Sequence, residues 1–292
     1  MRKKIKLFDP IIDISEEREA VRILRSGYWA SGAGSGKVLQ FENKFREYLG
    51  SDECIAVNSG TAALNLSLSL LNIKNKEVIL PSLSFVSTAH AVTLNGGIPI
   101  FVDIDPKTCC IDPNQIRKSI SKKTAVILPV HFAGMACNMD EILDVCKENN
   151  IHLIEDAAHA SGAKHNHKKI GRHGMAICFS FHPVKNIAML TGGLISINHK
   201  KHKKLKKLLN ERRWCGITNR LGLTYDVKEI GWNYYMNELS AALGLIQLKK
   251  LDRLNRIRNN IAKRYNNEIE LDEKMPYEKD CSYHFYWIMV KN

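Results

Sequence analysis

Two side chains that can do chemistry together stand just beyond two apolar segments of this sequence. Asp156 follows an apolar run that ends at Ile154, and Lys185 follows a second run that ends at Phe181. A carboxylate against a pyridine nitrogen keeps the ring protonated, so that the ring accepts the electrons of a carbanion, while a lysine amine holds an aldehyde as a Schiff base and moves the proton. The pair therefore indicates pyridoxal phosphate (PLP) chemistry, with Lys185 as the catalytic residue.

Each of these residues alone has an ordinary explanation. The chain has 43 lysine and arginine residues, most of which must be solvated, and a carboxylate that ends a strand often caps the next helix. The surrounding elements favour the chemical explanation. Residues 126–130 and 152–154 are predicted as buried strands, with a helix over 141–149 between them. Because ligands in open α/β sheets bind beyond the carboxyl ends of the strands, Asp156 falls on the expected edge.

A third segment predicts a phosphate site. The apolar run 55–57 is followed by Ser59, Gly60 and Thr61 and then by a helix pattern over 62–68. Amide groups at a helix N-terminus, together with the positive end of the helix dipole, bind phosphate. Ser180 could add a hydroxyl to the same phosphate. Serine and threonine are also ordinary N-caps, so this segment indicates a phosphate site only in combination with Asp156 and Lys185.

Ordered motifs along almost the whole chain resemble one enzyme family. They include Gly27-Tyr28-Trp29, Asn58-Ser59-Gly60-Thr61-Ala62-Ala63-Leu64, Pro81-Ser82-Leu83-Ser84-Phe85, Glu155-Asp156-Ala157-Ala158-His159, Ser180-Phe181-His182 with Lys185, Gly192-Gly193 and Gly231-Trp232-Asn233-Tyr234. The set is similar to that of the DegT-type aminotransferases. These are fold-type I PLP enzymes that aminate keto-sugars attached to nucleotides.

The resemblance implies an α/β fold: the large domain of a fold-type I PLP-transferase, with a mainly parallel, mixed central sheet flanked by helices. We expect residues 1–250 to form this PLP-binding domain. Residues 251–292 should hold the linking helix, predicted over 241–263, and the start of a truncated small C-terminal domain whose first strand is predicted over 283–290. A fragment, a frame-shifted gene and a naturally short protein are all compatible with this length, and we expect impaired turnover.

The resemblance also implies a role for each site residue. Lys185 matches the Schiff-base lysine and Asp156 the partner of the pyridine nitrogen. The phosphate cradle corresponds to Gly60, Thr61, Ala62 and Ser180. His159 matches a residue that contacts the ring or its hydroxyl, and Phe85 matches the aromatic residue that stacks on the ring, although a buried structural histidine and a core phenylalanine are the alternatives. Asn233 matches a residue that reaches the phosphate of the neighbouring subunit, which implies a homodimer with shared active sites.

The implied function is transfer of an amino group, with glutamate as the amino donor, to a nucleotide-linked keto-sugar for surface polysaccharide, O-antigen or amino-sugar biosynthesis. Sugar dehydratases of the same family carry histidine where Lys185 stands, so the lysine favours amino transfer. Two residues depart from the family pattern near the substrate side. Thr191 replaces the usual acid before the paired glycines, and Tyr235 replaces an arginine.

Composition excludes some kinds of site and segment but does not indicate a function. The eight cysteines lack paired metal spacing and the eleven histidines have no clustered acidic ligands, so we expect reduced thiols and no metal. Pro81 and His90 break the apolar run 78–94, and Asp9-Pro10 interrupts the basic start, so neither a membrane span nor an export signal is predicted and the expected location is the cytoplasm.

Two other classes of function compete with the enzyme. The net charge of +13 and the basic run that begins at Lys200 suggest a nucleic-acid binder, but the run lacks interleaved aromatic residues and a recognition motif, so no nucleic-acid partner is expected. The short C-terminus suggests a catalytically silent relative with a regulatory or assembly role, and the intact Lys185 and Asp156 oppose that alternative.

Overall fold

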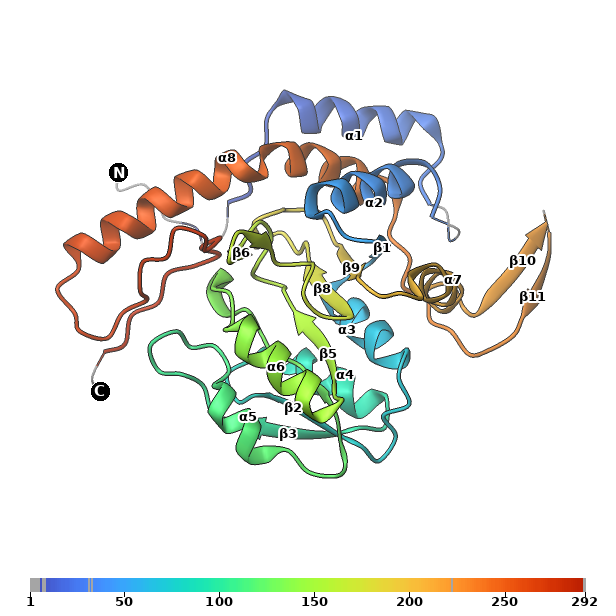
Figure 1. The fold of residues 1–292 in the computed structure, drawn as a ribbon. Helices are drawn as coiled ribbons and strands as arrows, with labels where there is room; N and C mark the ends of the chain where they lie inside the picture. The colour runs from blue at the N-terminus through green and yellow to red at the C-terminus, as the bar shows by residue number, and fades with distance from the viewer. Residues whose placement is uncertain (1–5, 7–8, 31, 33, 222, 291–292) are drawn as a thin grey trace.

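A seven-stranded mixed sheet lies at the centre of the structure, a computed structural model that describes residues 6, 9–30, 32, 34–221 and 223–290 (Figure 1). The strand order is β1-β9-β8-β5-β4-β2-β3; β9 runs antiparallel to both β1 and β8, and the other adjacent pairs are parallel. The predicted α/β architecture with a mainly parallel, mixed sheet is therefore confirmed. The strands are β1 (Glu53–Val57), β2 (Glu77–Pro81), β3 (Ile98–Val102), β4 (Thr124–Ile127), β5 (His152–Asp156), β8 (Ala176–Ser180) and β9 (Gly193–Ile197).

Helices cover both faces of the sheet, because successive strand side chains point to opposite faces and are apolar on each of them. Cys54 and Ala56 of β1 pack with helix α2, whereas Ile55 and Val57 of the same strand pack with α3. This two-sided burial is typical of a sheet enclosed by crossover helices. The helices are α1 (Ile14–Ser26), α2 (Gly36–Leu49), α3 (Gly60–Ser69), α4 (Val86–Leu94), α5 (Pro113–Ser119), the short 3-10 helix η1 (Phe132–Gly134), α6 (Met139–Asn149), α7 (His202–Arg212) and α8 (Glu238–Glu268).

Helix α8 is the long helix predicted over 241–263. It begins after Asn237, whose side chain accepts a hydrogen bond of 2.8 Å from the amide of Ser240. Asn237 is therefore the N-cap of α8. The helix packs along α1 and α2 (Figure 1). The division of the chain into two domains at residue 250 stays a prediction.

Two small hairpins complete the described structure: β6 (Lys164–His165) with β7 (Lys168–Lys169), and β10 (Ile217–Leu221) with β11 (Thr224–Val227). The β10–β11 hairpin projects away from the body of the protein beyond α7 (Figure 1). No helix among the residues described combines the length and the apolar character needed to cross a membrane.

The predicted strand over residues 283–290 is wrong. This segment is irregular and makes only an isolated bridge between Ile288 and Lys274. Its aromatic side chains pack on their surroundings instead: the ring of Tyr286 lies 5.5 Å from that of Tyr265 in α8. An apolar, aromatic run favours a strand, but a strand also needs a neighbouring backbone that pairs with it along its length.

Candidate active site

One edge of the sheet collects the residues predicted to do chemistry. The strands β1, β2, β4, β5 and β8 all end at this edge, and β9 begins there. A cavity of about 530 Å³ opens beyond it, which we call the Lys185 cavity. Seven of the nine predicted site residues line it: Gly60, Thr61, Phe85, Asp156, His159, Ser180 and Lys185.

Asp156 ends β5 at the floor of the Lys185 cavity and is only 4% exposed. Its carboxylate accepts hydrogen bonds from the Ala158 amide at 3.0 Å and from the Thr88 hydroxyl at 2.8 Å. Burial raises the pKa of Asp156, and these bonds together with the charge of Lys185 oppose that rise. The two hydrogen bonds thus fix the position of the carboxylate, while burial removes part of the stabilisation that water gives to its charge.

Lys185 stands in a tight turn after β8, where its amide donates to the carbonyl of His182 at 2.8 Å. The side chain is half-buried, and no carboxylate forms an ion pair with its amine among the residues described. Burial lowers the pKa of Lys185, and the charge of Asp156 opposes the shift. A lysine with a lowered pKa and no competing partner is suited to nucleophilic and proton-transfer work.

The helix N-terminus at the other end of the cavity can hold a phosphate. Ser59 caps α3 and accepts from the amide of Ala62 at 3.1 Å, while the amides of Gly60 and Thr61 precede the first helical hydrogen bonds. Gly60 lies so close to Ser180 that an added Cβ would meet the Cβ of Ser180 at 2.8 Å. The absence of a side chain at Gly60 keeps this end of the cavity open for an anion.

His159 and Phe85 complete the wall of the cavity. Nδ1 of His159 accepts the amide of Ala133 at 3.3 Å, so the neutral ring carries its proton on Nε2. Burial, aided by Lys185, lowers the pKa of His159 to about 3, which keeps that ring uncharged at neutral pH. Phe85 lies at the mouth of the cavity and is 72% exposed. Its exposure argues against the core alternative for this residue.

Ala62 and Asn233 are the two predicted site residues that do not line the Lys185 cavity. The amide of Ala62 is already bonded to Ser59, and its side chain is buried. Asn233 is exposed, and its carbonyl accepts from the side chain of Asn58 at 3.3 Å. The predicted contact of Asn233 with a neighbouring subunit stays a prediction.

Several residues that orient Asp156 or support the site were not predicted from the sequence. Thr88 relays a hydrogen bond from Ser84, at 2.7 Å, to Asp156. Behind the cavity, Nε2 of buried His131 lies 2.9 Å from Glu155, and its Nδ1 accepts the amide of Cys137. Thr88 and His131 bond to carboxylates 68 and 24 residues away, so no local pattern predicts these two contacts.

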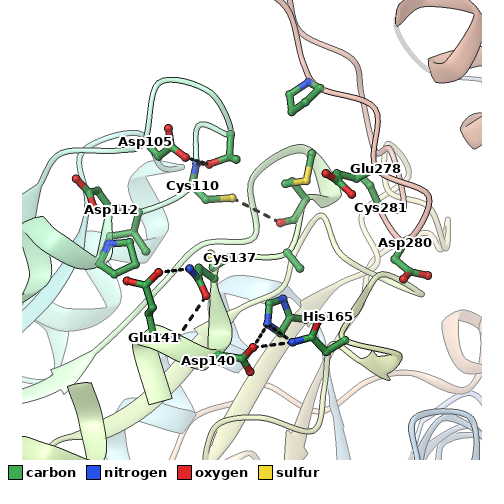
Figure 2. Close-up of a pocket in the computed structure, with 18 of the residues that line it drawn as sticks. Asp105, Cys110, Asp112, Cys137, Asp140, Glu141, His165, Glu278, Asp280 and Cys281 are labelled. Atoms are coloured by element: carbon green, nitrogen blue, oxygen red, sulfur yellow. Dashed lines mark hydrogen bonds and ion pairs between the residues drawn. The ribbon is translucent and has the colours of Figure 1, made fainter. Parts of the chain in front are cut away.

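A second, larger cavity of about 760 Å³ lies on another part of the molecule (Figure 2). We call it the acidic cavity, because its lining includes Asp105, Asp112, Asp140, Glu141, Glu278 and Asp280. Such a lining repels a phosphate group. Across the part of the chain that the structure describes, no three histidine, cysteine or acidic side chains are grouped to hold a metal ion. The residues of the Lys185 cavity, in contrast, offer an amine, a buried carboxylate and a phosphate cradle, and so fit PLP.

Comparison with known proteins agrees with this geometry. The sequence profile of the DegT/DnrJ/EryC1/StrS aminotransferase family matches residues 10–292. The spore coat polysaccharide biosynthesis protein SpsC of Bacillus subtilis is 37% identical over 262 residues, which cover 88% of this chain and 67% of SpsC. GDP-perosamine synthase of Vibrio cholerae is 31% identical over 287 residues, which cover 97% of this chain and 76% of that enzyme.

A solved structure shares the fold closely. The PLP form of the putative sugar aminotransferase Spr1654 from Streptococcus pneumoniae superposes with a TM-score of 0.90 at 27% identity, over 97% of this chain and 77% of the other. The architecture of the described residues is thus that of the fold-type I PLP enzymes. The family also takes the same cofactor that Asp156 and Lys185 predict.

Proposed function

Because this chain belongs to the DegT/DnrJ/EryC1/StrS aminotransferase family, we propose that it moves an amino group from glutamate to a nucleotide-linked keto-sugar. The observation that carries the proposal is the meeting of Lys185 and Asp156 in one cavity whose far end is a helix N-terminus. A silent structural relative has no need of an amine with a lowered pKa opposite a buried carboxylate.

The residues of the Lys185 cavity have separate tasks in this reaction. When bound, PLP withdraws electrons from the carbon that loses or gains the amino group and carries that group between substrates. Lys185 would hold the cofactor and move the proton at the reacting carbon, Asp156 would keep a proton on the ring nitrogen, and the amides of Gly60 and Thr61 would hold the phosphate. Neutral His159 would donate a hydrogen bond from Nε2 to the hydroxyl of the cofactor ring.

The class of substrate is supported by the relatives and by charge. One relative is named for synthesis of a GDP-linked amino-sugar and another for polysaccharide biosynthesis. The net charge of +13 favours the approach of a sugar that carries a nucleotide diphosphate. We propose surface polysaccharide, O-antigen or amino-sugar biosynthesis in the cytoplasm as the setting.

A turnover assay tests the proposal. The PLP-loaded protein is mixed with glutamate and a panel of nucleotide-linked keto-sugars, 2-oxoglutarate is measured by a coupled dehydrogenase, and the amino-sugar is identified by mass spectrometry. We expect equal amounts of both products from at least one sugar. Bound cofactor without turnover on any sugar would favour the silent relative, and salt-dependent retention on DNA without bound cofactor would favour the nucleic-acid binder.

A homodimer with shared active sites is the proposed assembly. The projecting β10–β11 hairpin and the segment after it expose Leu223 at 93% and Ile230 at 87%, and apolar exposure of this extent is typical of an interface. Phe85 is exposed at the mouth of the Lys185 cavity, and Asn233 is exposed beside Asn58, which precedes the N-cap of α3. A neighbouring subunit would cover both.

Light scattering tests the assembly. We expect a mass near twice the 33.1 kDa of one chain, and we expect Leu223→Lys to shift the equilibrium toward monomer by at least about tenfold, because a charge at the centre of an apolar contact costs more than 1.4 kcal/mol. Leu94→Lys, at another exposed leucine (70%) on α4, is the matched control and should leave the mass unchanged. A monomeric wild type that is fully active would contradict the shared site.

A further inference from the structure

A second opening adjoins Lys185 on the side away from the phosphate cradle. This cavity, about 460 Å³ in volume, we call the Arg258 cavity. Val184, Lys185 and Phe285 line both it and the Lys185 cavity, so Lys185 stands in the wall between the two spaces. The remaining lining comes from the N-terminal segment, from one face of α8, from His284 and from the turn around Lys185. A substrate bound in this space would reach the amine of Lys185 directly.

The Arg258 cavity carries an uncompensated positive charge. Arg258 is half-buried on α8, and its guanidinium makes one long hydrogen bond, 3.5 Å, to the carbonyl of His284. No carboxylate pairs with it within the described part of the chain. The acid in the lining, Asp9, is bonded to Lys6 at 2.9 Å. Because Lys6 and Asp9 offset each other, Lys185 and Arg258 leave the lining with a net positive charge, which favours a bound anion.

Neighbouring groups add to the preference for an anion. The imidazole of His284 lies against that of His159, with centroids 4.5 Å apart and the ring planes tilted by 31°. Burial, with His159, Lys185 and Arg258 nearby, lowers the pKa of His284. Its Nδ1 is buried without a partner among the described residues, and in the tautomer protonated there it is a further hydrogen-bond donor. The lining thus offers a guanidinium fork and an amine to a planar anion.

We propose that Arg258 binds a carboxylate of the amino donor and thereby holds the donor's α-carbon against Lys185, an inference that rests on the proposed function. A guanidinium matches a carboxylate with two parallel hydrogen bonds. The distance between anion and reacting carbon favours a carboxylate over a phosphate. In an amino acid the α-carboxylate is directly bonded to the carbon that carries the amine, whereas in a nucleotide-linked sugar the ring separates the diphosphate from the keto carbon. Arg258 is thus a residue that determines donor specificity.

Calorimetry with an unreactive dicarboxylate tests the assignment. Glutarate carries two carboxylates but no amine, and it is titrated into PLP-loaded wild type, Arg258→Met, Arg258→Lys and the control Arg256→Met, an exposed arginine half a turn away on α8. We expect the Kd for glutarate to rise by at least about tenfold in Arg258→Met, since a bond to a charged group is at stake, to rise less in Arg258→Lys, and to stay unchanged in Arg256→Met. Unchanged glutarate binding in Arg258→Met would overturn the proposal.

Two further measurements distinguish binding of the amino donor at Arg258 from binding of the sugar nucleotide there. Titration with a nucleoside diphosphate should give the same Kd in wild type and Arg258→Met, and a loss equal to that for glutarate would assign Arg258 to the sugar nucleotide instead and overturn the donor assignment. In steady-state assays, Arg258→Met should raise the KM for glutamate more than it lowers kcat. If wild type aminates no sugar, the proposed function fails, yet the glutarate titration still decides whether Arg258 binds a carboxylate.

Discussion

Replacement of Lys185 by alanine should lower amino transfer by about 10⁴-fold or more, because the proton-transfer role alone is worth about 10²- to 10⁴-fold and the covalent role adds to it. The side chain has no ion pair or hydrogen bond to lose among the described residues, so the fold should remain intact. Borohydride treatment of the wild type should fix the cofactor on a peptide that contains Lys185. The measurements are turnover, peptide mass mapping and thermal unfolding.

The matched control is Lys204→Ala, at an exposed lysine of α7. It should keep full activity and the same borohydride-labelled peptide. Labelling of wild type at another lysine, or retention of more than about a hundredth of the activity in Lys185→Ala, would reject the role of Lys185, because a residue whose removal costs so little is not the group that moves the proton.

Replacement of Asp156 by asparagine should lower turnover by about 10²- to 10³-fold, the usual effect of removing one fixed electrostatic contact to developing charge. Asparagine is nearly isosteric, can still accept from the Ala158 amide, and can donate to the Thr88 hydroxyl if that hydroxyl turns toward Ser84. The variant should therefore keep its cofactor attached to Lys185. Thr88→Val, which removes only one bond to Asp156, should lose less activity than Asp156→Asn.

The same substitution should stabilise the cofactor-free protein. Burial raises the pKa of Asp156 above its usual 3.8, so the stability that this group contributes is present below pH 3.8 and is lost as the pH rises through its folded-state pKa. At pH 7 the cofactor-free Asp156→Asn protein should exceed wild type by about 1 kcal/mol, or roughly 2–4 °C in Tm. The difference should shrink as the pH falls toward 4. A less stable variant at pH 7 would show that the carboxylate is not penalised by burial.

The sequence by itself predicted the α/β fold and the chemical core of the site. The apolar runs before Asp156 and Lys185 and the serine-glycine-threonine turn before α3 are local signals, and each places a functional group at the end of an element whose type is set by nearby residues. Because parallel strands end at one edge of a sheet, knowledge of the elements was sufficient to predict that these three groups meet. The resemblance of ordered motifs added the roles of Phe85 and His159.

Only the tertiary structure decided which other residues reach that edge. Thr88, His284 and Arg258 belong to segments far from Asp156 in the chain, and their contacts depend on how α4, the C-terminal segment and α8 pack against the sheet. The same packing limited the strand predicted over 283–290 to two backbone hydrogen bonds with residues 273–275, and it placed Tyr286 against α8 and Phe285 against Phe132. Local patterns determine the type of an element and its buried face, whereas the partners of a side chain depend on the three-dimensional packing of elements that no single window of sequence contains.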